Sequence, residues 1–511
     1  MDPRRLVYDW NRAAGEGRPR HLPVELVDET LRDGLQSPSA VTPTLGEKFE
    51  LIVLMARLGI DTAVIGIPAA GGSSREDVEW LVRRMTESGL AVRPGCAART
   101  LASDIEPIIA ISQRVGRALE MTTFIGSSPI RQYVEGWDLS RMMKMTRDAV
   151  SLGVRHGLHV TYVTEDTTRA RPGDLVALYG TAIAAGASRI CVCDTVGHAT
   201  PEGAAALVGF LAEFVARENP AVRIDWHGHQ DRGLGIANSL AALRAGAHRI
   251  HGCGLGVGER VGNTPLDLLL VNLQLLGWID RDLSALPRYV AKVSEHVKVP
   301  IPDGYPVVGR DAFRTGTGVH AAAIVKARAK GHDWLADRVY SGVPAGMVGL
   351  AQVIEVGPMS GESNVIFWLR ERCIEPTPQR IAALYRAAKA SDHVLSEAEI
   401  RTVLSALPDP AGAGAPVAEG VRGAWRDADD PASVESSSEF GISYQNAGRR
   451  LLSEAPPALS RLSLGGKGPL FEHARSLPPR SRGVRVAPCV LEGESVPGHA
   501  RRHRRVSRRP A

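Results

Sequence analysis

Two histidines separated by one residue are the feature of this sequence that most directly indicates a metal site. His227 and His229 lie in the segment Trp-His-Gly-His-Gln-Asp, directly after an apolar run. Because alternate side chains of a β-strand point to the same side, both imidazoles could reach one ion. Asp33, in an Arg-Asp-Gly segment near the N-terminus, could add a carboxylate. Two nitrogens and one oxygen suit a divalent cation such as Mg, Mn, Zn or Fe and leave positions open for water and substrate.

The same residues also have simpler explanations. Two histidines can line a polar surface without an ion, and Asp28, Glu29 and Asp33 can form an acidic loop that caps a helix. A third segment, residues 254–265, repeats glycine and so lets the backbone approach a ligand closely. It lacks the Gly-Lys-Ser/Thr ending of a nucleotide phosphate loop, and a flexible loop is the alternative.

Short apolar runs alternate with longer amphipathic ones and would position these groups. Helical periodicity follows the runs, as in residues 45–58 and 235–245. Eight strand-then-helix units are the number in an α/β fold of the (β/α)8 TIM-barrel type, whose C-terminal strand ends form one mouth. An open doubly wound sheet would require a glycine-rich loop after the first strand, where this sequence has Asp-Glu-Thr-Leu-Arg-Asp-Gly. The predicted strands are residues 24–28, 62–66, 91–94, 118–124, 159–163, 189–194, 223–227 and 249–252.

Four regions are expected in the 511 residues, a length beyond one ordinary domain. An N-terminal extension covers residues 1–22 and the catalytic barrel residues 23–280. A mostly helical subdomain follows over residues 281–405. Residues 406–511 are rich in Pro, Gly, Ser and Arg and are predicted to be a disordered tail.

The bulk composition excludes several functional classes. Much of the net charge of +5 comes from arginines in the last residues, so nucleic acid is not an expected partner. The six cysteines form no Cys-x-x-Cys pair, which argues against a disulfide scaffold or a zinc ribbon. No apolar run has the ~18–20 residues that span a bilayer, so no membrane partner is expected. A cytoplasmic enzyme is the prediction.

Three segments, residues 28–36, 227–238 and 256–266, resemble the signatures of the DRE-TIM metallolyase superfamily. More narrowly, they are similar to those of the 2-isopropylmalate, homocitrate and citramalate synthases, over roughly residues 24–370. The resemblance implies an acyltransferase that joins acetyl-CoA to a 2-oxo acid in a Claisen-type condensation. It also implies a homodimer and a divalent metal held by Asp33, His227 and His229, with Asn263 nearby, directly or through water.

The resemblance assigns roles to four further barrel residues. Arg32 would polarise the 2-oxo group and stabilise the developing alkoxide. Glu165, in a Glu-Asp segment after the fifth strand, matches a catalytic position. Thr195, in an Asp-Thr-Val-Gly segment, would contact the carboxylate of the oxo acid, and Arg99 would line the substrate site.

Two residues beyond the barrel complete the implied catalytic set. His320, in a Gly-Val-His segment, resembles the histidine that helps to deprotonate the methyl group of acetyl-CoA, commonly in the active site of a partner subunit. Tyr340 matches a tyrosine that accompanies it.

The sequence leaves the 2-oxo acid open. The segment Phe-Ile-Gly-Ser-Ser-Pro-Ile-Arg, residues 124–131, departs from the isopropylmalate and homocitrate patterns. Arg131 could meet a second anionic group, such as a distal carboxylate or a phosphorus oxyanion, or it could be a salt-bridged surface residue. The candidates are 2-oxoisovalerate, 2-oxoglutarate, oxaloacetate and an anionic oxo acid of specialised metabolism.

Two rival functions remain at this point. The segment Asp-Gly-Leu-Gln, residues 33–36, is shared with lyases of the 3-hydroxy-3-methylglutaryl-CoA lyase type. However, the loop after the eighth strand reads Gly-Val-Gly-Glu-Arg, where lyases of that type are expected to have a cysteine-bearing loop. The second rival is a non-catalytic, metabolite-binding barrel.

Overall fold

The computed structural model describes residues 6–13, 17–71 and 73–408. The tail predicted to be disordered lies outside these residues, except for its first three positions. Residues Trp10–Ala13 form a short helix, α1.

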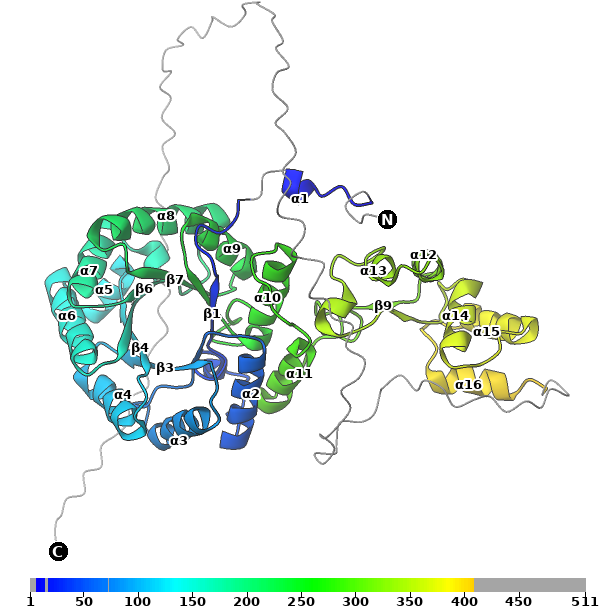
Figure 1. Ribbon diagram of the computed structural model, residues 1–511, viewed down its shortest axis with the longest axis horizontal. Coiled ribbons are helices and arrows are strands. Elements are labelled where there is room, and N and C mark those ends of the chain that lie inside the picture. Colours follow the sequence, from blue (N-terminus) through cyan, green and yellow to red (C-terminus); the bar gives the residue numbers. More distant parts are fainter. Residues whose placement is uncertain (1–5, 14–16, 72, 409–511) are drawn as a thin grey trace, which may run out of the picture. The chain divides into compact units, whose positions relative to one another are not determined.

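Eight parallel strands close into a barrel in the order in which they occur along the chain (Figure 1). The closure is made by the first and last strands, which pair in register from Glu25 opposite Arg249 to Asp28 opposite Gly252. This confirms the predicted TIM barrel. The strands are β1 (Glu25–Asp28), β2 (Thr62–Val64), β3 (Arg93–Arg99), β4 (Glu120–Gly126), β5 (His159–Glu165), β6 (Arg189–Asp194), β7 (Arg223–Gly228) and β8 (Arg249–Gly252).

Helices follow the strands and surround the barrel (Figure 1). The first of them, α2, begins at a capping box in which the side chains and backbone N–H groups of Thr44 and Glu47 bond reciprocally. These helices are α2 (Leu45–Arg57), α3 (Ser74–Glu87), α4 (Ala102–Val115), α5 (Pro129–Glu135), α6 (Leu139–Arg155), α7 (Pro172–Ala184), α8 (Pro201–Glu218), α9 (Gly235–Ala245) and α10 (Leu266–Leu275).

The two faces of each strand enter different cores. On β3, Cys96 and Ala98 belong to the large cluster between strands and helices, whereas Ala97 belongs to a separate small cluster. This small cluster also contains Val27 of β1 and Val64 of β2. Because alternate side chains of a strand point to opposite faces, the small cluster lies on the inner side of the barrel.

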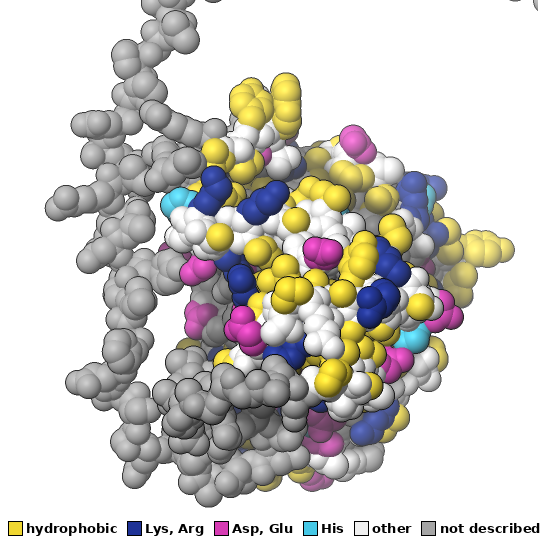
Figure 2. All heavy atoms as spheres, turned by 90° about the vertical axis from the view of Figure 1, so that its right-hand side faces the viewer, with side chains coloured by type: hydrophobic (Ala, Val, Ile, Leu, Met, Phe, Trp, Pro, Cys, Tyr) yellow, Lys and Arg dark blue, Asp and Glu magenta, His cyan; other side chains and the backbone are white. Residues whose placement is uncertain are grey.

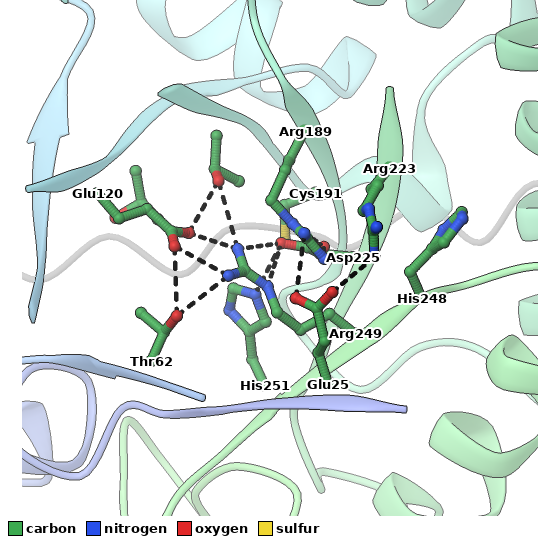
Figure 3. A network of polar contacts seen from close by, with 12 residues as sticks. Glu25, Thr62, Glu120, Arg189, Cys191, Arg223, Asp225, His248, Arg249 and His251 are labelled. Atoms are coloured by element: carbon green, nitrogen blue, oxygen red, sulfur yellow. Dashed lines mark hydrogen bonds and ion pairs between the residues drawn. The ribbon is translucent and has the colours of Figure 1, made fainter. Parts of the chain in front are cut away.

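Paired charges fill the inner side of the barrel near the N-terminal ends of the strands (Figure 3). Arg249, which is fully buried, donates to Glu120 at 2.9 Å and to Asp225 at 2.9 Å. Arg189 donates to the other oxygen of Asp225, also at 2.9 Å. Burial raises the pKa of Glu120, but Arg249 outweighs it and the pKa falls to about 2. This ionic layer closes the end of the barrel opposite to the mouth.

The region after the barrel strands is mostly helical, as predicted. Helix α11 (Leu286–Val297) packs on the barrel core through Tyr289 and Val293. A parallel pair of two-residue strands, β9 (Arg314–Thr315) and β10 (Val353–Ile354), was not predicted. The remaining helices are α12 (Gly318–Ala329), α13 (Asp333–Ala336), α14 (Glu362–Glu371), α15 (Pro378–Ala390) and α16 (Glu397–Ser405).

These later helices have cores of their own. Trp368, Leu384 and Ile400 join α14, α15 and α16 in one buried cluster, while Ala321 and Ala336 join α12 and α13 in another. The face of the molecule seen in Figure 2 carries hydrophobic side chains interspersed with charged ones of both signs. Within the described ranges, no helix is both long and apolar enough to cross a membrane.

Candidate active site

The predicted metal ligands converge at the mouth of the barrel. Asp33 follows β1, and His227 and His229 lie at the end of β7; all three are buried. The Nε2 atoms of the two histidines are 3.3 Å apart, and Oδ2 of Asp33 lies 3.3 Å from His227 and 3.5 Å from His229. Ligand atoms that bind one ion at about 2.0–2.2 Å are themselves separated by about 3.0–3.5 Å. The three donors therefore fit a divalent metal.

Asn263 lies beside this set because its backbone forms a β-bridge with that of His229. Its Nδ2 donates to the carbonyl of Val257 at 3.1 Å, while its Oδ1 is buried without a hydrogen-bond partner. A buried amide oxygen left in this state is unusual and suits an ion or a water bound to one.

Glu29 and His251 form a second layer behind the ligands, and sequence reasoning did not identify them as functional. Glu29 accepts from Arg32 Nε at 2.6 Å, and its Oε1 lies 2.7 Å from Nδ1 of His251 and 3.7 Å from Nδ1 of His227. Burial raises the pKa of Glu29, but the Arg32 guanidinium and both imidazoles hold it well below its ordinary value. Glu29 therefore stays charged and can orient both Arg32 and His227.

His251 connects this layer to the ionic layer below. Its Nε2 lies 3.3 Å from Oδ2 of Asp225, which Figure 3 shows against Arg249. Burial lowers the pKa of His251, but the neighbouring Cys191 and the carboxylates of Asp225 and Glu29 raise it to about 9. A polar residue at an inward position of the eighth strand is the signal that could have identified it.

Three of the residues assigned by resemblance line one cavity with the ligands. The cavity has a volume of about 270 Å³, and Arg32, Glu165 and Thr195 all face it. The hydroxyl oxygen of Thr195 accepts from the backbone N–H of Asp166 at 2.8 Å, so its proton is free to donate to a ligand. Burial raises the pKa of Glu165 despite the nearby arginines. A carboxyl group with a raised pKa keeps its proton to a higher pH than an ordinary glutamate does.

The structure places the two other candidate arginines outside the cavity lining. Arg99 donates to Asp104 through Nε at 2.7 Å and through Nη2 at 2.9 Å. Arg131 lies 3.1 Å from Glu135 and 3.8 Å from Glu165. Both guanidinium groups are thus engaged with carboxylates of their own chain.

His320 and Tyr340 lie together, although neither lines the barrel cavity. Their rings stack with centroids 3.9 Å apart and an angle of 24° between planes. His320 is half-buried on α12, and Tyr340, in the turn after α13, is 50% exposed. The pairing that was expected from the resemblance is therefore present.

Comparison with known proteins gives a consistent set of relatives. The HMGL-like family model matches residues 23–293. Homocitrate synthase AksA of Methanopyrus kandleri is 32% identical over 421 residues, which cover 81% of this chain and 97% of that protein. The 2-isopropylmalate synthase of Pyrococcus abyssi is 33% identical over 317 residues, or 60% of this chain and 63% of that one.

The barrel is also similar to solved structures. One is the HMG-CoA lyase of Bacillus subtilis, with 18% identity and a TM-score of 0.47 over 56% of this chain and 97% of that one.

Proposed function

This chain belongs to the HMGL-like family, and we propose that it is an acyltransferase that condenses acetyl-CoA with a 2-oxo acid. One observation carries the proposal: Asp33, His227 and His229 converge on one point of a cavity that Arg32, Glu165 and Thr195 also line. The names of the relatives, homocitrate synthase and 2-isopropylmalate synthase, support this class of reaction.

The cavity residues can perform the parts of such a reaction. A divalent cation on the ligand set would act as a Lewis acid toward the keto oxygen. Arg32 stabilises the negative charge that develops on that oxygen, and Glu29 holds the guanidinium in place. Thr195 donates its hydroxyl proton to the carboxylate of the oxo acid. Glu165 delivers or removes a proton beside the reacting carbon.

The stacked pair outside the cavity supplies the other half of the chemistry. His320, held by Tyr340, takes a proton from the acetyl methyl group, and the resulting carbanion attacks the keto carbon. A new carbon–carbon bond forms, and the alkoxide oxygen takes up a proton. Water then cleaves the thioester, releasing the CoA thiol and driving the condensation forward. We place this pair in the active site of the partner subunit of a homodimer.

The test is thiol release from acetyl-CoA by the full-length protein with Mg, Mn, Zn or Fe. A panel of 2-oxo acids is added singly, and a reaction without acid measures simple hydrolysis. We expect acid-dependent thiol release that matches consumption of the oxo acid. His229→Ala should abolish it, whereas His198→Ala, which changes an exposed histidine of the same mouth, should not.

Two results would contradict this function. One is the absence of thiol release with every acid from a folded, metal-loaded protein. The other is cleavage of a hydroxyacyl-CoA in place of condensation, which would assign the chain to the lyases.

A further inference from the structure

The cavity has one wall that is apolar, built by the strands opposite to the metal ligands. Ile67, Ala97, Phe124 and Val163 all line it. The first three also belong to, or pack on, the small inner cluster of the barrel. From this wall we propose that the 2-oxo acid is a monocarboxylate with a short apolar side chain; the inference rests on the proposed function and narrows its substrate class.

The order of the strands around the barrel determines how a 2-oxo acid would be oriented in the cavity. The ion ligands come from β1 and β7, and Thr195 follows β6, whereas the apolar residues come from β3, β4, β5 and the loop after β2. Because the strands are neighbours in sequence order, β3 and β4 lie across the barrel from β7 and β8, so that Ala97 and Phe124 face the histidine ligands across the cavity. A 2-oxo acid held by its carboxylate and keto oxygen at the ligand side points its side chain at the apolar wall.

The charges of the lining leave no place for a second carboxylate. The lining carries the carboxylates of Glu29, Asp33, Glu165 and Glu259 on one side of the charge balance, and the two guanidinium groups of Arg32 and Arg260 with three imidazoles on the other. Both arginines are already paired, Arg32 with Glu29 and Arg260 with Asp231 at 2.8 Å. A distal carboxylate would enter the apolar wall beside Glu165, and the guanidinium group there, that of Arg131, is shared between Glu135 at 3.1 Å and Glu165 at 3.8 Å. A buried charge without a cation of its own is strongly unfavourable.

The arginines at the end of β3 and after β4 offer no free guanidinium group to a second carboxylate of the substrate. Neither arginine lines the cavity: Arg131 lies between Glu135 and Glu165, with its Nε buried without a hydrogen-bond partner, and Arg99 is held by Asp104. The hydroxyl of Thr122, the polar group among the β4 residues that line the cavity, donates to the carbonyl of Cys96 at 3.1 Å. The wall therefore recognises the side chain of the 2-oxo acid by its shape and by apolar contact.

The first test compares kcat/KM for pyruvate, 2-oxobutyrate and 2-oxoisovalerate with that for oxaloacetate and 2-oxoglutarate. We expect at least one monocarboxylate to exceed both dicarboxylates by about a hundred-fold or more, because the apolar wall would have to bury the distal carboxylate without a cation of its own. A dicarboxylate that is used as well as the best monocarboxylate would overturn the inference while leaving the condensation intact.

Failure of the proposed function gives a different result. If no acid supports thiol release, the condensation is wrong, and the wall is then tested by calorimetric binding of 2-oxoisovalerate and 2-oxoglutarate to the Mn-loaded protein. Tighter binding of 2-oxoglutarate would overturn the inference there too.

Two variants on one strand distinguish an effect of the wall on the substrate from a general effect on packing. Ala97→Val adds two methyl groups on the cavity side of β3, and Ala98→Val adds the same groups on the side that faces the helices. We expect Ala97→Val to lower kcat/KM for the bulkiest accepted acid relative to pyruvate by about ten-fold or more. Ala98→Val should leave that ratio unchanged, because loss of folded protein affects both acids equally. Equal ratios in both variants would overturn the inference.

Discussion

Replacing Glu29 by Gln should weaken metal binding, although Glu29 is not one of the three predicted ligands. The substitution keeps the shape of the side chain and removes its charge. In the unsubstituted protein, the carboxylate faces Nδ1 of His227 at 3.7 Å and also holds Arg32. Without it, the imidazole is oriented less firmly. Arg32, whose guanidinium lies 3.7 Å from Asp33, is then free to compete for that ligand carboxylate.

The structure sets the size of this effect. Groups that orient a metal-bound histidine typically contribute about 10–100-fold in affinity. The distance from Glu29 to His227 is longer than a hydrogen bond, which places the direct effect at the lower end of that range. Competition by Arg32 adds to it. We therefore expect a loss of about 10–30-fold, or about 1.4–2 kcal/mol.

The assay is calorimetric titration of metal-free protein with Mn²⁺ at constant pH. Glu259→Gln is the matched control, because it removes the same charge from the lining of the same cavity. It should weaken binding by less than about three-fold. Binding by Glu29→Gln within two-fold of the unsubstituted protein would refute the positioning role, and so would an equal loss in both variants.

The same titration distinguishes two ligand sets. Glu29, His227 and His251 also lie close enough together to hold an ion. If they were the ligands, Asp33→Asn would leave Mn²⁺ affinity nearly unchanged while Glu29→Gln would abolish binding. We expect the reverse order, with Asp33→Asn the more damaging variant.

Two further predictions concern stability. Arg249→Met should lower the free energy of unfolding by about 3–5 kcal/mol, because it leaves the carboxylates of Glu120 and Asp225 buried without this partner. The free energy is measured by urea unfolding, and a loss below about 1 kcal/mol would contradict the prediction. Burial, with the positive groups nearby, lowers the pKa of His248 to about 4, and its Nδ1 accepts from a backbone N–H of β7 at 3.1 Å. The unfolded chain therefore takes up this proton first, and stability should fall as the pH drops from about 6.5 to 4, by about 1–2 kcal/mol after allowance for solvent screening. His248→Gln should remove that part of the pH dependence, so an unchanged slope would count against it.

The strand ends were predictable because their signals are local. Apolar runs, and the polar residues that directly follow them, suffice to place Asp33, His227 and His229 at one mouth of a barrel. The third strand was the least accurate, since the sequence predicts residues 91–94 and the structure has Arg93–Arg99. Pro94 and Gly95 are typical of a turn, but here Gly95 allows close contact with Thr62 and Val64 of the neighbouring strand.

The contacts of the second layer could not be predicted from such signals, although an inward polar residue on the eighth strand marks His251 itself as a candidate. Glu29 and His251 are far apart in sequence, and they meet only because β1 closes the barrel on β8. That register places Glu29 directly after the paired Asp28, where its N–H donates to the carbonyl of Gly252 at 2.8 Å. The pairing of Arg99 and Arg131 with carboxylates of the same chain likewise depends on side-chain partners that a motif does not specify.

The apolar wall and the three proposed metal ligands are built from different side chains, which has a consequence for the specificity of the site. Ala97 forms a small buried apolar cluster with Val27 and Val64, and Phe124 packs on it. Under the proposed function, a substitution there changes the surface that the side chain of the acid meets without removing one of the three proposed metal ligands. The choice of acid and the binding of the ion would then be open to separate changes in the same barrel.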